Sequence, residues 1–172
     1  MNTKIALLAL IEIISALSMG VTMLFITYKG LKYLAIKRYS IEKNNLAYSI
    51  FMSGVLLSVG IMMSGVVDPL LSVFRVLSSN SSETTSAILF SFIFNGGKYI
   101  AIAYVLSVII IIIGVSIYVN LTPIDEFKEI KNNNIGVAII VVTIIITLTL
   151  MSKDGVILFI ESIVPYPNLS PR

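Results

Sequence analysis

Two short stretches of this chain are nearly alike: IEKNNLAYSI at residues 41–50 and IKNNNIGVAI at residues 130–139. Isoleucine stands at the first and last position of both, and two consecutive asparagines occupy the same places in each. Each stretch leads into a long apolar run. A repeat at the entrance of two apolar runs indicates that the chain consists of two related membrane halves in tandem.

The composition predicts a membrane protein. Hydrophobic residues make up 57% of the 172 residues, charged residues make up 12%, and the mean hydropathy is +0.99. A soluble domain carries about 25% charged residues, and a domain this small leaves most of its residues in contact with the surface. We therefore expect an all-α integral membrane protein in contact with the lipid bilayer.

Four segments are long enough to cross about 30 Å of hydrocarbon, which takes about 20 helical residues. Helices are required because lipid offers no partner for open backbone groups. The first two spans would form one two-helix repeat, residues 1–80, and the last two a second repeat, residues 81–172. Since each repeat holds an even number of spans, the two should have the same, parallel orientation. The expected spans are residues 5–28, 46–67, 95–118 and 135–152.

Apolar segments beside these spans leave two alternatives open. They are either short interfacial helices at the membrane surface or parts of long tilted helices. Within the second of them, Asn95, Gly96 and Gly97 favour a break before the third span. The segments are residues 69–77, 86–97 and 156–164, and an irregular tail is expected at residues 165–172.

Positive charge predicts the orientation of the chain. The connection at residues 29–45 is rich in lysine, and the loop at residues 119–134 agrees with it through Lys128 and Lys131. Positively charged loops stay in the cytoplasm. We therefore expect a multi-pass protein of the cell (inner, cytoplasmic) membrane, with both loops in the cytoplasm and both termini outside.

The most distinctive run joins the third and fourth spans: LTPIDEFKEI at residues 121–130, followed by Asn134 and then Val-Ala-Ile. It resembles the signature of a prokaryotic inner-membrane family, the domain of unknown function 350 type. The resemblance implies two such units, or four helices, an envelope location and no established activity. The residues that carry it are Leu121, Thr122, Pro123, Asp125, Glu129 and Asn134, with Asn45 as the repeat-related partner of Asn134 in the first half.

Local rules predict a helix inside this loop. Thr122 suits an N-cap, Pro123 suits the first helical position, and the acidic residues that follow favour the positive end of a helix. We expect a short amphipathic helix from Pro123 to about Lys131. The asparagines either cap the following spans or contact a ligand or partner. The candidates are Asn44 or Asn45 for the second span and Asn133 or Asn134 for the fourth.

Ionisable residues at membrane depth are costly and are therefore candidate functional residues. In the expected orientation, Glu12, Asp68, Lys98 and Asp154 fall in the outer half of the membrane. They would form a polar cluster that lines a path for ions, with Glu12 paired to Lys98. The alternative is that they are helix-end side chains that reach water.

Small residues recur on the second span at Gly54, Gly60 and Gly65. Such residues let helices approach closely in lipid. We therefore expect these three glycines at helix-packing contacts.

The sequence also excludes several kinds of chemistry. It has no cysteine and no histidine, which removes thiol and imidazole catalysis and the usual zinc, copper and haem ligands. The basic residues stand mostly at helix ends, so we expect no nucleic acid partner. We expect no catalytic residue, no enzyme activity, no metal and no cofactor.

Two function hypotheses remain. The first is a small membrane component of the cell envelope that forms a homo-oligomer or binds a membrane protein partner, and its support is the small size and the small-residue helix faces. The second is a channel or transporter subunit that moves protons or small ions along the polar cluster. The sequence favours the first.

Overall fold

The structure is a computed structural model that describes residues 3–37, 39, 41, 44–69 and 85–163. For residues 3–9, 11, 12, 15 and 85–95 it describes the backbone alone. Helices make up nearly all of this part of the chain, which contains no strand, so the expected all-α class is confirmed for it. The helices are α1 (Thr3–Lys37), α2 (Leu46–Ser64), α4 (Thr85–Leu121), α5 (Glu126–Lys131) and α6 (Ile135–Ile163).

Three stretches of the described chain are long and apolar enough to cross a membrane: Leu46–Pro69, Gly96–Leu121 and Ile135–Ile163. The first and last of them contain the second and fourth expected spans, and Gly96–Leu121 covers the third expected span from its second residue onward. The first expected span lies within α1, which has 35 residues and is therefore about 52 Å long at 1.5 Å per residue. That α1 is a fourth span stays a prediction.

The helix α1 continues past residue 28, where the sequence predicts the end of the first span. Lysine is a good helix former, and its long side chain can follow the helix surface to reach water. The Lys29 amine lies 4.5 Å from the centre of the Phe25 ring, and the Lys37 amine lies 5.0 Å from that of Tyr33. Each lysine therefore packs on an aromatic ring one turn earlier, which is compatible with an unbroken helix.

Two of the undecided apolar segments prolong long helices. Residues 86–97 belong to α4, and residues 156–163 belong to α6. The predicted break at Asn95, Gly96 and Gly97 is wrong, because α4 is continuous there. A glycine costs a helix about 1 kcal/mol, whereas opening the backbone in lipid costs several kcal/mol per unsatisfied group. Apart from Pro69, the third segment, residues 69–77, lies outside the described residues, as do residues 164–172.

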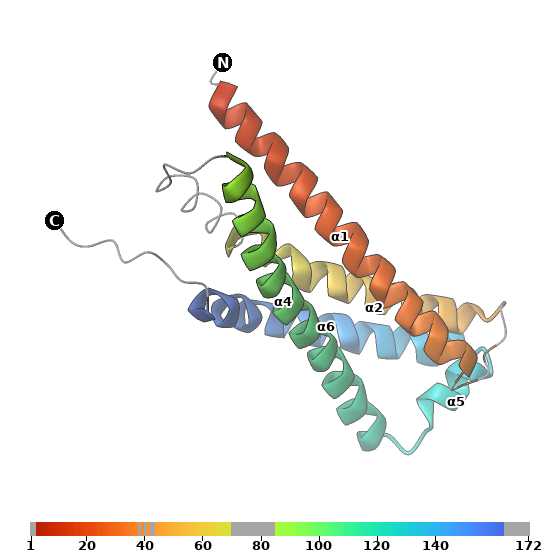
Figure 1. The fold of residues 1–172 in the computed structure, drawn as a ribbon. Coiled ribbons are helices and arrows are strands. Elements are labelled where there is room, and N and C mark those ends of the chain that lie inside the picture. Colours follow the sequence, from red (N-terminus) through yellow and green to blue (C-terminus); the bar gives the residue numbers. More distant parts are fainter. Residues whose placement is uncertain (1–2, 38, 40, 42–43, 70–84, 164–172) are drawn as a thin grey trace.

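The two central helices, α2 and α6, lie side by side and run in the same direction (Figure 1). The other long helices, α1 and α4, cross them, and both run toward the end of the molecule that holds α5. We call this end, with the described residues 37, 39, 41, 44–48 and 121–135, the α5 end. A parallel pair is the arrangement expected for the two repeats, although the tandem repeat itself stays a prediction.

Glycines set the close approach of α6 to its neighbours. A Cβ added at Gly54 would lie 2.5 Å from the Val142 side chain, and one at Gly65 would lie 2.5 Å from that of Ile157. On α4, a Cβ added at Gly114 would lie 2.6 Å from the Leu148 side chain. The sequence analysis missed this contact. These contacts pack helices of one chain together, so they do not by themselves indicate a contact between chains.

The remaining glycine of the predicted set differs. A Cβ added at Gly60 meets nothing within 4 Å, and Gly60 lines a groove between α1 and α2. Gly60 therefore borders an unfilled space and makes no close contact with α6.

The short helix α5 begins at Glu126, and its N-cap is Asp125. The Asp125 carboxylate accepts a hydrogen bond from the Lys128 backbone N–H at 3.1 Å. The predicted start with Thr122 as cap and Pro123 as first residue is therefore wrong. The competing acceptor was already in the sequence: aspartate is an N-cap at least as good as threonine.

Candidate functional site

The four residues of the expected polar cluster come from α1, α4, α6 and the segment that follows α2. The side chains of Asp68, Lys98 and Asp154 are exposed, and none of them lines either of the two cavities described below. Glu12 lies in α1, but its side chain is outside what the structure describes. The polar cluster and its path for ions therefore stay predictions.

The two similar stretches of the sequence meet at the α5 end. Asn45 is the N-cap of α2, and its side-chain oxygen accepts a hydrogen bond from the Tyr48 backbone N–H at 2.6 Å. Its amide group donates to the backbone carbonyl oxygens of Ile130 at 2.8 Å and Lys131 at 2.9 Å. Asn45 therefore provides hydrogen-bond partners for backbone groups at the start of α2 and at the end of α5.

The second stretch returns the interaction. The Asn133 side-chain oxygen accepts a hydrogen bond from the Ala47 backbone N–H at 3.0 Å. Asn133 has a φ of 65°, in the left-handed region that asparagine tolerates better than most residues. We call these reciprocal bonds of Asn45 and Asn133 the asparagine clasp.

Asn134 has a local role instead. Its side-chain oxygen accepts from the Val137 backbone N–H at 3.3 Å, at the start of α6, and its amide donates to the Glu129 carboxylate at 2.8 Å. Of the four candidate asparagines, Asn45 and Asn134 cap the spans. The capping alternative thus holds for both, and Asn45 also contacts another part of the chain.

Glu126 is a buried acid that the sequence analysis did not select. It is 3% exposed, and one carboxylate oxygen accepts a hydrogen bond from the Thr122 hydroxyl. The other oxygen has no hydrogen-bond partner among the described residues. Two further residues of the motif, Leu121 and Pro123, are exposed beside it. The four-residue spacing of Thr122 and Glu126 was the sequence feature that could have predicted this hydrogen bond.

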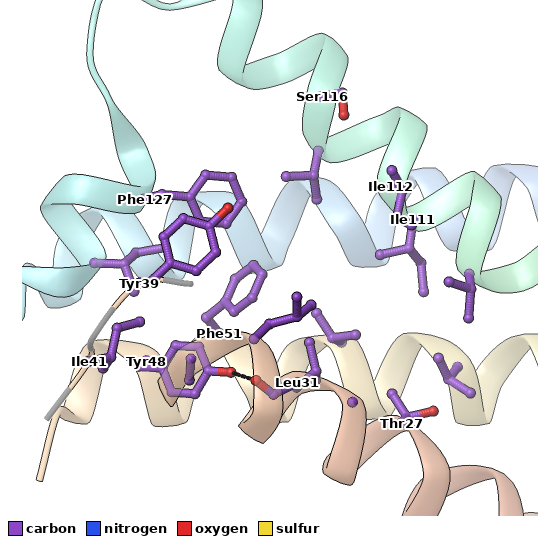
Figure 2. A pocket seen from close by; sticks show the side chains of 18 of the residues that line it. Thr27, Leu31, Tyr39, Ile41, Tyr48, Phe51, Ile111, Ile112, Ser116 and Phe127 are labelled. Atoms are coloured by element: carbon purple, nitrogen blue, oxygen red, sulfur yellow. Dashed lines mark hydrogen bonds between the residues drawn. The ribbon is translucent and has the colours of Figure 1, made fainter. Parts of the chain in front are cut away.

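The side chains of Tyr39, Tyr48, Phe51 and Phe127 form an aromatic cluster (Figure 2). The rings of Tyr39 and Phe127 are stacked with centres 5.3 Å apart, and Phe51 meets Phe127 edge-on at 6.0 Å. Tyr48 lies beside Phe51, and its hydroxyl donates to the Leu31 backbone carbonyl oxygen at 2.6 Å. The cluster therefore joins α1, α2 and α5.

The cluster closes one end of a cavity of about 530 Å³ between α1, α2, α4 and α5. At its other end, the Thr27 and Tyr104 hydroxyl oxygens lie 3.1 Å apart and connect α1 to α4. Figure 2 shows Thr27 and the aromatic cluster at opposite ends of the drawn lining. Most of the lining consists of aliphatic side chains, such as Val55 and Ile111. We call this space the α1–α4 cavity.

A second, smaller groove of about 210 Å³ lies between α1 and α2. Four small residues line it in two pairs, each pair one helical turn apart: Ala16 and Gly20 on α1, and Gly60 and Ser64 on α2. Added Cβ atoms at Gly20 and Gly60 would meet nothing within 4 Å. We call this space the small-residue groove.

These features suit binding by shape rather than chemistry. Within the described residues, no three His, Cys, Asp or Glu side chains gather closely enough to hold a metal ion. The cavity and the groove both lack convergent charges, and such apolar spaces recognise apolar surfaces. The sequence analysis missed the aromatic cluster because Tyr39, Tyr48 and Phe127 come from different segments without a common spacing.

The long apolar helices and the hydrogen-bonded loops between them define a helical membrane protein. Within that class, the chain belongs to the DUF350 family, a domain of unknown function, whose family model matches residues 5–156. The resemblance drawn from the loop at residues 121–139 is thereby confirmed. No curated protein and no solved structure matches the chain.

Proposed function

We propose that this chain is a small oligomerising component of the cell membrane, whose copies associate at the small-residue groove. The groove is the single observation that carries the proposal. Its four small residues come from two helices of different parts of the sequence, Ala16 and Gly20 on one side and Gly60 and Ser64 on the other. A role of this kind needs no catalytic residue.

The physics of helix association in lipid favours such a surface. Lipid tails are as apolar as leucine, so helices associate through close packing, and small residues permit that packing. An unfilled space loses the dispersion contacts that its lining would otherwise make. A side chain of a second copy that enters the groove at Gly20 and Gly60 would recover them. Met19 and Met63 also line the groove, and methionine adapts its shape to a partner.

The test compares leucine substitutions at three open glycines. Gly20→Leu and Gly60→Leu fill the groove, whereas Gly155→Leu adds the same side chain to α6, where an added Cβ likewise meets nothing within 4 Å. The mass of the detergent-solubilised protein, measured by light scattering with correction for bound lipid, reports the assembly. We expect an oligomer for wild type and Gly155→Leu and a smaller species for the two groove variants.

Two results would contradict this proposal. A wild-type protein that is a monomer at all concentrations would remove its basis, and so would groove variants with the mass of wild type. Gly54 and Gly65 are unsuitable for this test, because they contact α6 within the same chain. Their substitution would disturb the fold before it reached any interface.

The second candidate is a channel or transporter subunit for protons or small ions. One observation favours it: Ser58 of α2 and Thr149 of α6 are fully buried, and their hydroxyls have no hydrogen-bond partner among the described residues. Buried hydroxyls normally have partners, so water at this level would extend a polar path. Reconstituted wild type should then conduct protons more than empty vesicles, and Glu12→Gln should change the flux without changing assembly.

For the orientation we propose that the α5 end faces the cytoplasm. The described lysines at this end are Lys37, Lys128 and Lys131, all exposed, and positive charge is retained on the cytoplasmic side. The chain has no cysteine, so Lys37→Cys provides a unique thiol. A membrane-impermeant maleimide should label it in inverted vesicles and not in intact cells, and the opposite pattern would reverse the orientation.

A further inference from the structure

The α1–α4 cavity has a different character from the small-residue groove. We propose that it holds one acyl chain of an anionic phospholipid, whose headgroup lies beside the lysines of the α5 end. Both spaces are lined by Val59, but none of the groove's four small residues lines the cavity, so the proposed lipid site does not rest on the proposed oligomer.

The size and shape of the cavity fit a chain. Its volume of about 530 Å³ lies within the range of roughly 300–1,000 Å³ found for small-molecule sites. On α4 its lining runs from Tyr104 to Ser116, which is about 18 Å along a helix. An apolar space of that length can hold an extended hydrocarbon chain.

Five hydroxyl groups line the cavity, those of Thr27, Tyr39, Tyr48, Tyr104 and Ser116, and three of them already have a hydrogen-bond partner. The hydroxyls of Thr27 and Tyr104 lie within hydrogen-bond distance of each other, and the Tyr48 hydroxyl donates to the Leu31 carbonyl oxygen. These three hydroxyls hold the walls together, and most of the remaining lining is aliphatic. The interior therefore favours an occupant without hydrogen-bonding groups of its own, which is the chemistry of an acyl chain.

The cavity opens to the side where lipid would lie. Its lining residues Ile26 and Leu34 on α1 are 47% and 43% exposed, and Ile112 on α4 is 58% exposed. All three are apolar, so the opening has the polarity of the bilayer core. A lipid chain can thus enter sideways between α1 and α4 without crossing a polar barrier.

The charge at the α5 end selects the headgroup. Lys37 follows the lining residue Leu34 by three positions on α1, and Lys131 follows the lining residue Ile130 on α5; both lysines are exposed. Residues three apart on a helix are neighbours on its surface. Basic residues at a membrane surface attract anionic lipids, so a phospholipid with its chain in the cavity gains this contact only if its headgroup is negative.

The experiment is native mass spectrometry of the full chain released from nanodiscs of equal parts phosphatidylglycerol and phosphatidylcholine with the same acyl chains. We expect wild type to retain one phosphatidylglycerol, at least fivefold above phosphatidylcholine. Gly30→Phe fills the cavity from α1, where an added Cβ meets nothing within 4 Å, and should lower retention at least tenfold. Gly155→Phe, outside the cavity, should retain lipid as wild type does.

Further variants keep the result decisive. If Gly30→Phe loses helical circular dichroism, Val108→Trp fills the same cavity from α4 and should give the same loss of lipid. Lys37→Gln should reduce the preference for phosphatidylglycerol while a lipid is still retained.

Several outcomes overturn the proposal. Equal retention by wild type and both filled variants means that the cavity binds no lipid. Equal retention of the two lipids by wild type removes the headgroup contact. A change of oligomer mass in Gly30→Phe with unchanged lipid retention makes the cavity a protein interface.

Discussion

Replacing Asn45 by alanine should be among the most destabilising single changes at the α5 end. The side chain is 7% exposed and makes three hydrogen bonds: one to the Tyr48 N–H at 2.6 Å and two to the carbonyl oxygens of Ile130 and Lys131 at 2.8 and 2.9 Å. An N-cap is worth about 1 kcal/mol, and a buried hydrogen bond about 1 kcal/mol net. Asn45→Ala should therefore lower the free energy of unfolding by about 3 kcal/mol.

The measurement is pulse proteolysis across an SDS titration in mixed micelles, which reports the fraction of folded protein. Asn44→Ala is the matched control, because Asn44 is the exposed neighbour of Asn45; it should stay within about 0.5 kcal/mol of wild type. Asn45→Asp separates the two roles. It keeps the capping oxygen but loses both donors, so its stability should stay well below that of wild type.

The reasoning fails if Asn45→Ala and Asn44→Ala unfold at the same SDS fraction. In that case the bonds between α2 and α5 would contribute nothing net, and water would replace them at no cost. If Asn45→Asp were as stable as wild type, only the N-cap would matter, and the bonds to Ile130 and Lys131 would be incidental.

Two more predictions concern glycine packing and the left-handed residue. Gly54→Leu should lower the midpoint of the same SDS titration by an amount that corresponds to about 1–3 kcal/mol or more, because its side chain would overlap Val142. Gly155→Leu is the control and should leave the midpoint unchanged. Equal midpoints for the two variants would contradict the packing of Gly54 on Val142. Asn133→Gly should lose only the hydrogen bond to the Ala47 N–H. Asn133→Val should lower the free energy of unfolding by about 1–2 kcal/mol more than Asn133→Gly, because residue 133 has a φ of 65°, which valine tolerates poorly. Equal stability of these two variants would show that the backbone rearranges.

The sequence predicts most of the architecture because the bilayer imposes it. Long apolar runs have to be helical in lipid, so the all-α class follows from composition alone. The first residues of α2 and α6 could also be predicted, because an asparagine before an apolar run is a strong N-cap. Here Asn45 and Asn134 both follow the rule.

Helix ends were harder to predict, because hydrophobicity locates the membrane and not the helix. The helix α1 continues through Lys29 and Lys32, where hydropathy falls but helix propensity stays high. The glycines at residues 96–97 suggested a break, yet continuous backbone hydrogen bonding in α4 prevailed. At α5 two capping residues competed, and Asp125 prevailed over Thr122.

The candidate sites depend on contacts that periodicity does not contain. Phe51 and Phe127 meet edge-on although 75 residues of intervening chain make no pattern that pairs them. The glycines show the same limit: Gly54 and Gly60 look equivalent in the sequence, but one touches Val142 and the other faces an open groove. Only the rotation of α2 between its neighbours decides which glycine is filled.

The asparagine clasp has a consequence for the biogenesis of the protein. Asn45 and Ile130, which it joins, are 85 residues apart in the chain. At translation rates of about 5–20 residues per second, roughly 4–17 s pass between the emergence of the two partners from the ribosome. During that interval the Gly54 face of α2 has no α6 to pack against, so the docking of α2 on α6 is a late step in the biogenesis of the protein.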